Sequence, residues 1–396
     1  MFAVLSDARK VLSRLFIFMS LMWLAACDGV AVPGAGGTGS GQQIDPSTPI
    51  PVALLVPHGS ANSGEAALAR DLESAARLAV SDLDGVRIDL RVYGTAGQAA
   101  KAQQAALNAV SDGARIILGP LHAESANAVA VAMAPRDVNV LAFSNNATIA
   151  GGNLFVLGNT FENTADRILG YARRNGKSNV LIVSSDNLAG QIGQEAISRA
   201  AAANGMTVAG RVGYNFSQEG VVGAVPRVTS TARQTNADTL MLTSNTAGAL
   251  PLFAQMLPEN GLTPEAIQWT GLTRWDQPPQ TLALPGLQGG WFTLPDTNRA
   301  TRFRNRFKET YGNDPHAIAG LAYDGIAAIG ALARSGRSDA LTRGSLTQTA
   351  GFQGTGGAFR LLPDGTNQRA LAVATIRDKQ VVVLDPAPRS FGSGGF

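Results

Sequence analysis

Short apolar runs alternate with amphipathic helical segments along most of this 396-residue chain, and this alternation restricts the possible folds more than any other feature. The run at 52–56 is apolar throughout and ends at Pro57, which is typical of a strand buried on both faces of a parallel sheet. A helix is expected next, because apolar residues at 64–83 recur on one helical face. Further strands are expected at 86–92, 115–118 and 138–142, and further helices at 99–110 and 125–133. The fold class is therefore predicted to be α/β, with an open parallel sheet flanked by helices.

The alternation starts again near residue 164 and predicts a second α/β unit. Helices are expected at 164–174, 190–203, 221–234 and 247–257, and strands at 179–184, 207–212, 239–242 and 266–269. Two amphipathic helices are expected at 299–311 and 318–333. The last apolar runs, at 358–361, 370–376 and 381–384, are separated by turn-forming residues, as in antiparallel hairpins.

The N-terminal residues have the pattern of a secretory signal peptide. A basic segment precedes an apolar run at 15–23, and the small residues Ala25 and Ala26 precede Cys27. This order resembles the lipobox of bacterial lipoproteins, which implies a signal peptide at 1–26, acylation of Cys27 and a lipid anchor at the periplasmic face of the cell envelope. The alternative is a short membrane anchor with an incidental cysteine, but the apolar run is too short to span about 30 Å of hydrocarbon. The choice between inner and outer membrane stays open.

Composition and net charge indicate which segments are unstructured and which functions are not expected. The segment 27–50 is rich in Gly, Ser, Thr and Pro and is predicted to be a flexible tether, and 386–396 is predicted to be a disordered tail. The formal net charge is +3, and removal of the signal peptide, which holds three basic residues and one acidic residue, leaves +1. A nearly neutral protein is not expected to bind nucleic acid.

The residue pattern gives no support to an enzyme, a metal site or a cofactor. His58, His122 and His316 lie in separate segments without metal-ligand spacing, and the single cysteine is assigned to the lipid. The segment 170–178 superficially resembles a phosphate-binding loop. However, its glycines are one residue too far apart, and it lies between a helix and a strand in the wrong order. The chain is therefore expected to be non-catalytic.

The order of motifs along the chain resembles that of the type I periplasmic binding proteins, the leucine/isoleucine/valine-receptor superfamily. The matching segments are 52–57 with the helix that follows, 113–121, 140–148 and Tyr323-Asp324-Gly325. The resemblance extends from about residue 51 to 384. It implies two lobes joined by three crossovers, with a cleft between them: lobe one at 51–160 plus 293–346, and lobe two at 161–292 plus 347–385.

The candidate ligand-binding residues follow from this topology, because open α/β sheets bind ligands beyond the carboxyl ends of their strands. They are Ser60, Glu124, Ser125, Ser144, Asn145, Asn146, Asp186, Asn187, Asn245 and Arg274. Each polar group could instead cap the helix or turn that follows its strand. Amino-acid receptors tend to carry Tyr-Gly where this chain has Asp186-Asn187, which argues against an aromatic-lined amino-acid pocket. Tyr323 is expected to pack on lobe one and not to contact the ligand.

Two functions remain open. Within the superfamily, the segments 119–121, 141–146, 155–160 and 167–169 most resemble penicillin-binding protein activators. That resemblance implies docking to a peptidoglycan synthase and regulation of peptidoglycan synthesis. The alternative is the substrate-binding receptor of an ABC importer, with an ABC permease as partner and a branched-chain amino acid or another small polar molecule as ligand. A receptor needs polar groups that converge in the cleft, whereas an activator can leave the cleft empty.

Overall fold

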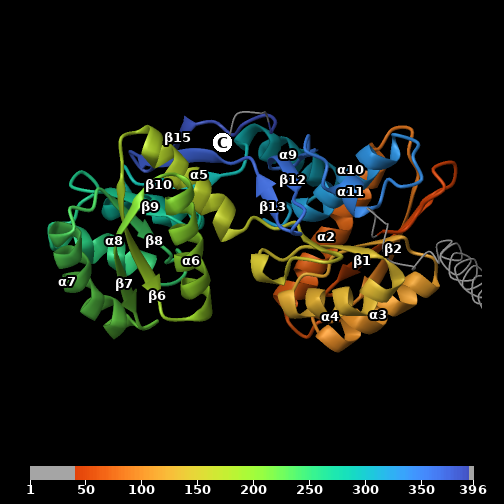
Figure 1. The fold of residues 1–396 in the computed structure, drawn as a ribbon, viewed down its shortest axis with the longest axis horizontal. Coiled ribbons are helices and arrows are strands. Elements are labelled where there is room, and N and C mark those ends of the chain that lie inside the picture. Colours follow the sequence, from red (N-terminus) through yellow and green to blue (C-terminus); the bar gives the residue numbers. More distant parts are fainter. Residues whose placement is uncertain (1–40, 392–396) are drawn as a thin grey trace, which may run out of the picture. The chain divides into compact units, whose positions relative to one another are not determined.

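The computed structural model describes residues 41–391. The predicted signal peptide, Cys27 and most of the predicted tether lie outside these residues. The described chain forms two α/β lobes with separate hydrophobic cores (Figure 1). This is the fold class expected from the alternation of apolar runs and helices.

Lobe one is built on a five-stranded parallel sheet of order β2-β1-β3-β4-β5. Its strands are β1 (Ile50–Val56), β2 (Ile88–Gly94), β3 (Ile116–Leu118), β4 (Asn139–Ala142) and β5 (Leu154–Val156). Its first helices are α2 (Ser63–Asp82), α3 (Ala99–Ser111) and α4 (Ala123–Met133), with the 3-10 turns η1 (Ala134–Arg136) and η2 (Ala147–Ile149). In β1, Val52 and Leu54 pack into the core under α2, whereas Ala53 and Leu55 pack into the core under α3 and α4. Burial on both faces is why this strand is apolar throughout.

Lobe two is built on a seven-stranded sheet of order β15-β14-β10-β9-β8-β6-β7. Its strands are β6 (Asn179–Ser185), β7 (Thr207–Tyr214), β8 (Thr239–Leu242), β9 (Gln268–Gly271), β10 (Trp291–Leu294), β14 (Ala372–Arg377) and β15 (Gln380–Asp385). Its helices are α5 (Phe161–Arg174), α6 (Leu188–Ala203), α7 (Gln218–Gln234) and α8 (Leu250–Glu259), with the 3-10 turns η3 (Pro279–Ala283) and η4 (Pro285–Leu287). Strands β6 to β10 are parallel to one another. Strand β14 pairs with β10 in the antiparallel direction, and β15 pairs with β14 as a hairpin.

The C-terminal third returns to lobe one before it completes lobe two. It contains α9 (Thr297–Tyr311), α10 (Gly320–Ala333), α11 (Arg343–Leu346) and a small antiparallel sheet of β11 (Phe352–Gly354), β12 (Gly357–Leu361) and β13 (Asn367–Arg369). Phe352 and Phe359 belong to the same core as Ile326 of α10. The predicted start of the last lobe-two segment at residue 347 is therefore corrected, because these aromatic side chains hold β11–β13 on lobe one.

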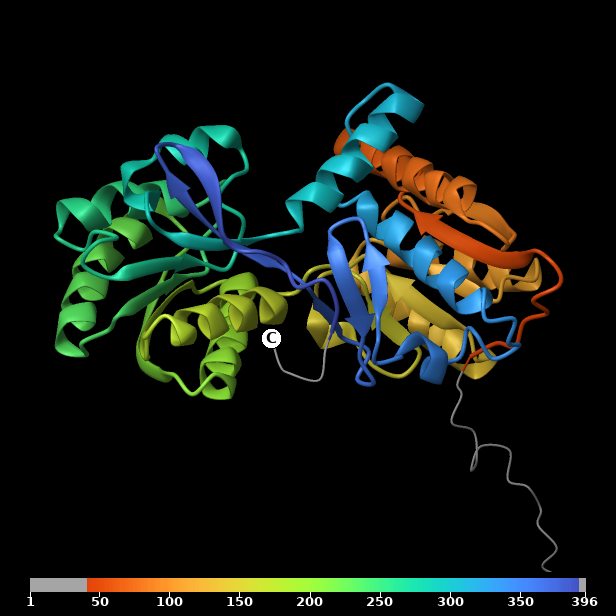
Figure 2. The ribbon, with the colours of Figure 1, turned by 90° about the horizontal axis from the view of Figure 1, so that it is seen from above.

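Within residues 41–391, the chain passes between the lobes at 157–160, 295–296 and 370–371, and it returns to lobe one once more after β15 (Figure 2). The predicted tether is also shorter than expected, because the chain already packs on lobe one before β1. Ile44 is buried and its amide donates to the Ser338 carbonyl over 2.9 Å, and the Gln42 side chain donates to the Arg136 carbonyl over 2.6 Å. At the other end, the Arg389 carbonyl accepts a hydrogen bond from Gln353, so the predicted tail does not begin at residue 386.

Candidate functional site

A cavity of about 640 Å³ lies beside the connecting segments and receives residues from both lobes. Its polar lining includes His122, Ser144, Asn145, Asn146, Asn159, Arg274, Gln277, Thr293, Asp324, Thr355 and Arg369. Its apolar lining includes Leu68, Leu121, Phe143, Leu294, Pro295, Ile318, Leu321 and Leu371. Apolar walls with a few convergent polar groups are typical of a binding site for a small molecule.

On lobe one, the loop after β4 brings Ser144, Asn145 and Asn146 to the cavity. The Ser144 hydroxyl accepts a hydrogen bond from the Asn146 amide at 3.1 Å, and the Asn146 side chain accepts one from the Thr148 amide at 2.9 Å. The first connecting segment packs closely on this loop, because a Cβ atom at Gly158 would lie 2.6 Å from the Ser144 carbonyl oxygen. Asn145 is exposed, and its side chain forms no hydrogen bond with residues 41–391. Its amide is therefore available to a ligand.

On lobe two, the loop after β9 brings Arg274 to the cavity. Arg274 binds Asp276 through two contacts, from Nε to Oδ1 at 2.9 Å and from Nη2 to Oδ2 at 2.5 Å. The intervening Trp275 is fully buried and stacks on Phe292 with 5.9 Å between ring centroids. A side chain at Gly271 would collide with the Trp275 indole, so this glycine is needed for the packing. The buried indole and the two-point ion pair together fix the guanidinium at the wall.

A buried ion pair joins α10 to β13 at the same cavity. Asp324 Oδ2 lies 3.0 Å from Arg369 Nη1, and their side chains are 1% and 10% exposed. Asp324 Oδ1 accepts the Thr355 amide at 2.6 Å, and Arg369 Nε donates to the Leu157 carbonyl at 2.8 Å. The guanidinium also lies over the Phe359 ring, 5.0 Å from its centroid. The pair therefore ties the first connecting segment to lobe one.

Neither partner of this pair was among the candidate site residues. Tyr323, the neighbour of Asp324 in the matched motif, lies outside the cavity lining and donates to Asp82 on α2 at 3.0 Å. Burial, reinforced by the hydrogen bond to Asp82, raises the pKa of Tyr323 to about 12. Tyr323 thus has the packing position that was expected for it.

The structure brings four of the candidate residues together at the cavity: Ser144, Asn145, Asn146 and Arg274. The other candidates are not part of its lining. Ser60 donates to Glu65 at 2.8 Å, and Glu65 in turn contacts the wall residue His122 at 3.1 Å, so Ser60 lies two contacts behind the wall. On α4, Glu124 is exposed and Ser125 is buried inside the lobe.

The lobe-two candidates mostly have local structural contacts. Asn187 is the N-cap of α6 and accepts the Gly190 amide at 2.8 Å. Asp186 accepts the Phe216 amide at 3.2 Å and lines a separate depression of about 350 Å³ at the end of β7. The backbone carbonyl of Asn245 accepts hydrogen bonds from the amides of Gly248 and Leu250 in the following turn. For Asn187 the capping interpretation is the one that the geometry favours.

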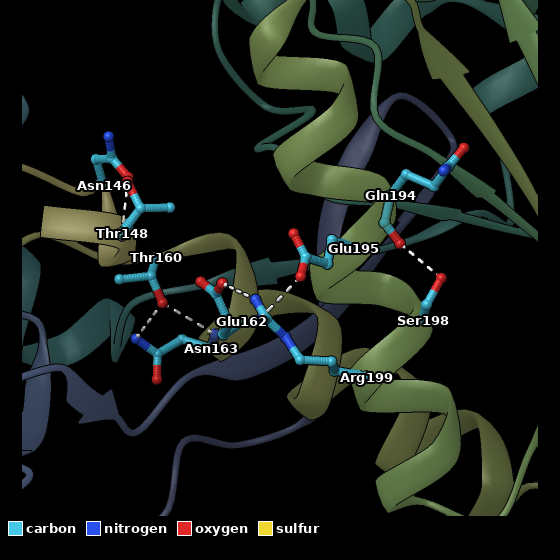
Figure 3. A network of polar contacts seen from close by, with 9 residues as sticks. All are labelled: Asn146, Thr148, Thr160, Glu162, Asn163, Gln194, Glu195, Ser198 and Arg199. Carbon is cyan, nitrogen blue, oxygen red and sulfur yellow. Dashed lines mark hydrogen bonds and ion pairs between the residues drawn. The ribbon is translucent and has the colours of Figure 1, made fainter. Parts of the chain in front are cut away.

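A second cavity, of about 450 Å³, is lined by η2, α5, α6 and the β12–β13 turn. Figure 3 shows the polar network along it: Thr160 accepts the Asn163 amide at 3.3 Å, and Arg199 contacts Glu162 at 2.7 Å and Glu195 at 3.5 Å. Arg199 is largely exposed, and its charge is already matched by these carboxylates. Exposed ion pairs of this kind contribute little to the free energy of folding. Because the Arg199 charge is already matched by carboxylates, it is less suited to a ligand, and the larger cavity is the candidate site.

Residues 41–391 include no helix that combines the length and hydropathy needed to cross a membrane. The same residues hold no group of three or more His, Cys, Asp and Glu side chains suited to a metal ion.

Comparison with known proteins gives one family and many similar folds. Residues 49–380 match a family model described as periplasmic binding protein. No curated protein matches the sequence. A protein from Rhodospirillum rubrum assigned to a branched-chain amino acid ABC transporter aligns with a TM-score of 0.72 and 18% identity, over 85% of this chain and 100% of that chain.

Two further structures extend the comparison. An ABC transporter substrate-binding protein from Sphaerobacter thermophilus has a TM-score of 0.66 and 16% identity, over 88% of this chain and 100% of that one. A solute-binding protein of an R. palustris ABC transporter, solved in complex with benzoate, has a TM-score of 0.55 and 16% identity, over 87% of this chain and 97% of that chain. At these identities the similarity concerns the fold.

Proposed function

Because the chain belongs to the periplasmic binding protein family, we propose that it is the substrate-binding receptor of an ABC importer for a small organic molecule. The observation that carries the proposal is the cavity beside the connecting segments, which Asn145 and Arg274 from different lobes line together with apolar walls. Such a site can hold one ligand against both lobes at once. Binding that depends on both lobes favours the closed form, which a permease can then recognise.

The family is one of periplasmic ligand-binding proteins, and the similar structures named above are ABC transporter proteins. These findings support the receptor over the penicillin-binding protein activator that the sequence motifs favoured. An activator can leave the cleft empty and use an outer surface, so it does not require convergent donors in a cavity. The proposal includes a non-catalytic role and a lipid anchor at Cys27, which lies outside the described residues.

Affinity capture from crosslinked, detergent-solubilised envelopes, read by mass spectrometry, tests this function. The tagged, full-length protein should recover the permease and ATPase subunits of an ABC importer. Recovery of a peptidoglycan synthase without any permease would favour the activator and contradict the receptor. The matched control is the same protein with Cys27→Ala, which should be released from the membrane while keeping its fold.

A further inference from the structure

Building on the receptor function, we propose that the ligand is a small carboxylic acid with an apolar body and no ammonium group. The inference comes from the charges that the cavity presents at its surface. It separates this chain from a receptor for zwitterionic amino acids, which must satisfy both a carboxylate and an ammonium group.

The accessible ionic group at the wall is a cation. The Arg274 side chain is 38% exposed, and its Nε and Nη2 bind Asp276. Its Nη1 has no acceptor among residues 41–391. A guanidinium with unused N–H groups is well suited to a ligand carboxylate, and charge-assisted hydrogen bonds are stronger than neutral ones. The free amide of Asn145 and that of Gln277 line the same cavity and can add neutral donors.

No comparably accessible anion faces this cation. Asp324 is the only carboxylate that lines the cavity among the described residues, it is 1% exposed, and both of its oxygens are already bonded, to Thr355 and Arg369. Asp276 is outside the lining, is 15% exposed and holds Arg274 with both oxygens. Glu65, also outside the lining, bonds Ser60 with one oxygen and His122 with the other.

An ammonium group would therefore lose its water in this cavity without gaining a carboxylate partner. Burying an unpaired charge is strongly unfavourable. An acid without that group avoids this penalty and keeps the contact with Arg274. Leu68, Leu121, Phe143 and Ile318 supply the surface for an apolar body. A cavity of about 640 Å³ is within the usual range for a small-molecule site.

Matched pairs of ligands test the inference by isothermal titration calorimetry. One pair is 4-methylpentanoate and L-leucine, and the other is 3-phenylpropanoate and L-phenylalanine; within each pair the molecules differ only in the ammonium group. The acid of at least one pair should bind wild-type protein at least tenfold more tightly than its amino acid. Arg274→Gln should weaken binding of that acid by about ten- to a hundredfold.

Two further variants keep the result interpretable. Arg304→Gln removes an exposed arginine of α9 that lies outside the cavity lining, and it should leave the affinity unchanged. Arg274→Lys keeps the positive charge and should retain part of the affinity. Because the comparison within each pair uses wild-type protein, it stands even if Arg274→Gln is poorly folded.

Tighter binding of L-leucine or L-phenylalanine than of the matching acid would overturn the inference and leave the receptor function in place. Binding of neither acid at millimolar concentration would overturn it as well. An acid that binds equally well to wild type and to folded Arg274→Gln would contradict the assigned contact. Failure of the receptor function itself would be seen separately, as capture of a synthase in place of a permease.

Discussion

At the scale of single residues, the strongest constraint at the site is the ion pair between Asp324 and Arg369. Its partners are almost completely buried, and each has a further hydrogen bond to the backbone. Desolvation offsets much of the attraction in such a pair, so its net contribution to stability is small. Removal of one partner is different, because the other charge is left buried without compensation.

Asp324→Asn should therefore lower the free energy of unfolding by about 3–5 kcal/mol, measured by urea denaturation. The matched control is Asp314→Asn, which removes an exposed contact with Lys308 and should cost at most about 1 kcal/mol. Equal, small losses in both variants would show that the Arg369 charge has another compensating partner.

The site residues that could be predicted from the sequence are those that follow a strand directly. Ser144, Asn145, Asn146 and Arg274 were predicted because ligand sites in α/β sheets lie beyond the carboxyl ends of strands, and all four line the cavity. Asp324 and Arg369 could not be found in this way, since they lie on a helix and on the small added sheet and meet only in the folded chain. Asn187 follows a strand too, but its side chain is used by its own helix.

At the scale of elements, strands buried on both faces were predictable because their apolar character does not depend on the partner. The edge strands β2, β7 and β15 were expected too, but the short strands β5, β10, β11 and β13 were not. Strand β13 reads Asn-Gln-Arg and shows no apolar run, and its side chains instead make polar contacts with α5, the first connecting segment and α10. The tether boundary was misplaced for a similar reason, because Ile44 is one apolar residue in a polar segment.

The N-terminus of α6 provides a prediction at this scale. Asn187→Ala removes the side-chain acceptor for the Gly190 amide and should cost about 1 kcal/mol in free energy of unfolding, with unchanged ligand affinity. Asn187→Asp should be nearly neutral for stability, because an aspartate also caps a helix. A loss of affinity in Asn187→Ala without loss of stability would instead identify Asn187 as a ligand contact.

At the scale of the whole molecule, side chains link the elements that flank the first and third connecting segments. Asn163, in the first turn of α5, donates to Asn367 at 2.7 Å and accepts the Arg369 amide at 3.1 Å, and Asn367 donates to the Val156 carbonyl at 2.7 Å. This network joins β5 and α5, which flank the first connecting segment, to β13, which directly precedes the third. A receptor needs a hinge that moves as a unit, and these contacts suit that purpose.

The central claim is that ligand binding in the cavity closes one lobe on the other. It is tested most directly by double electron–electron resonance between spin labels at Val131→Cys on α4 and Val222→Cys on α7, two exposed positions on different lobes, in a Cys27→Ala background that removes the single native cysteine. Saturation with the compound of the two pairs that binds most tightly in the calorimetry should shift the distance distribution to one narrower population. Superimposable distributions for the free and the saturated protein would contradict the receptor account, because binding would then leave the lobes where they were.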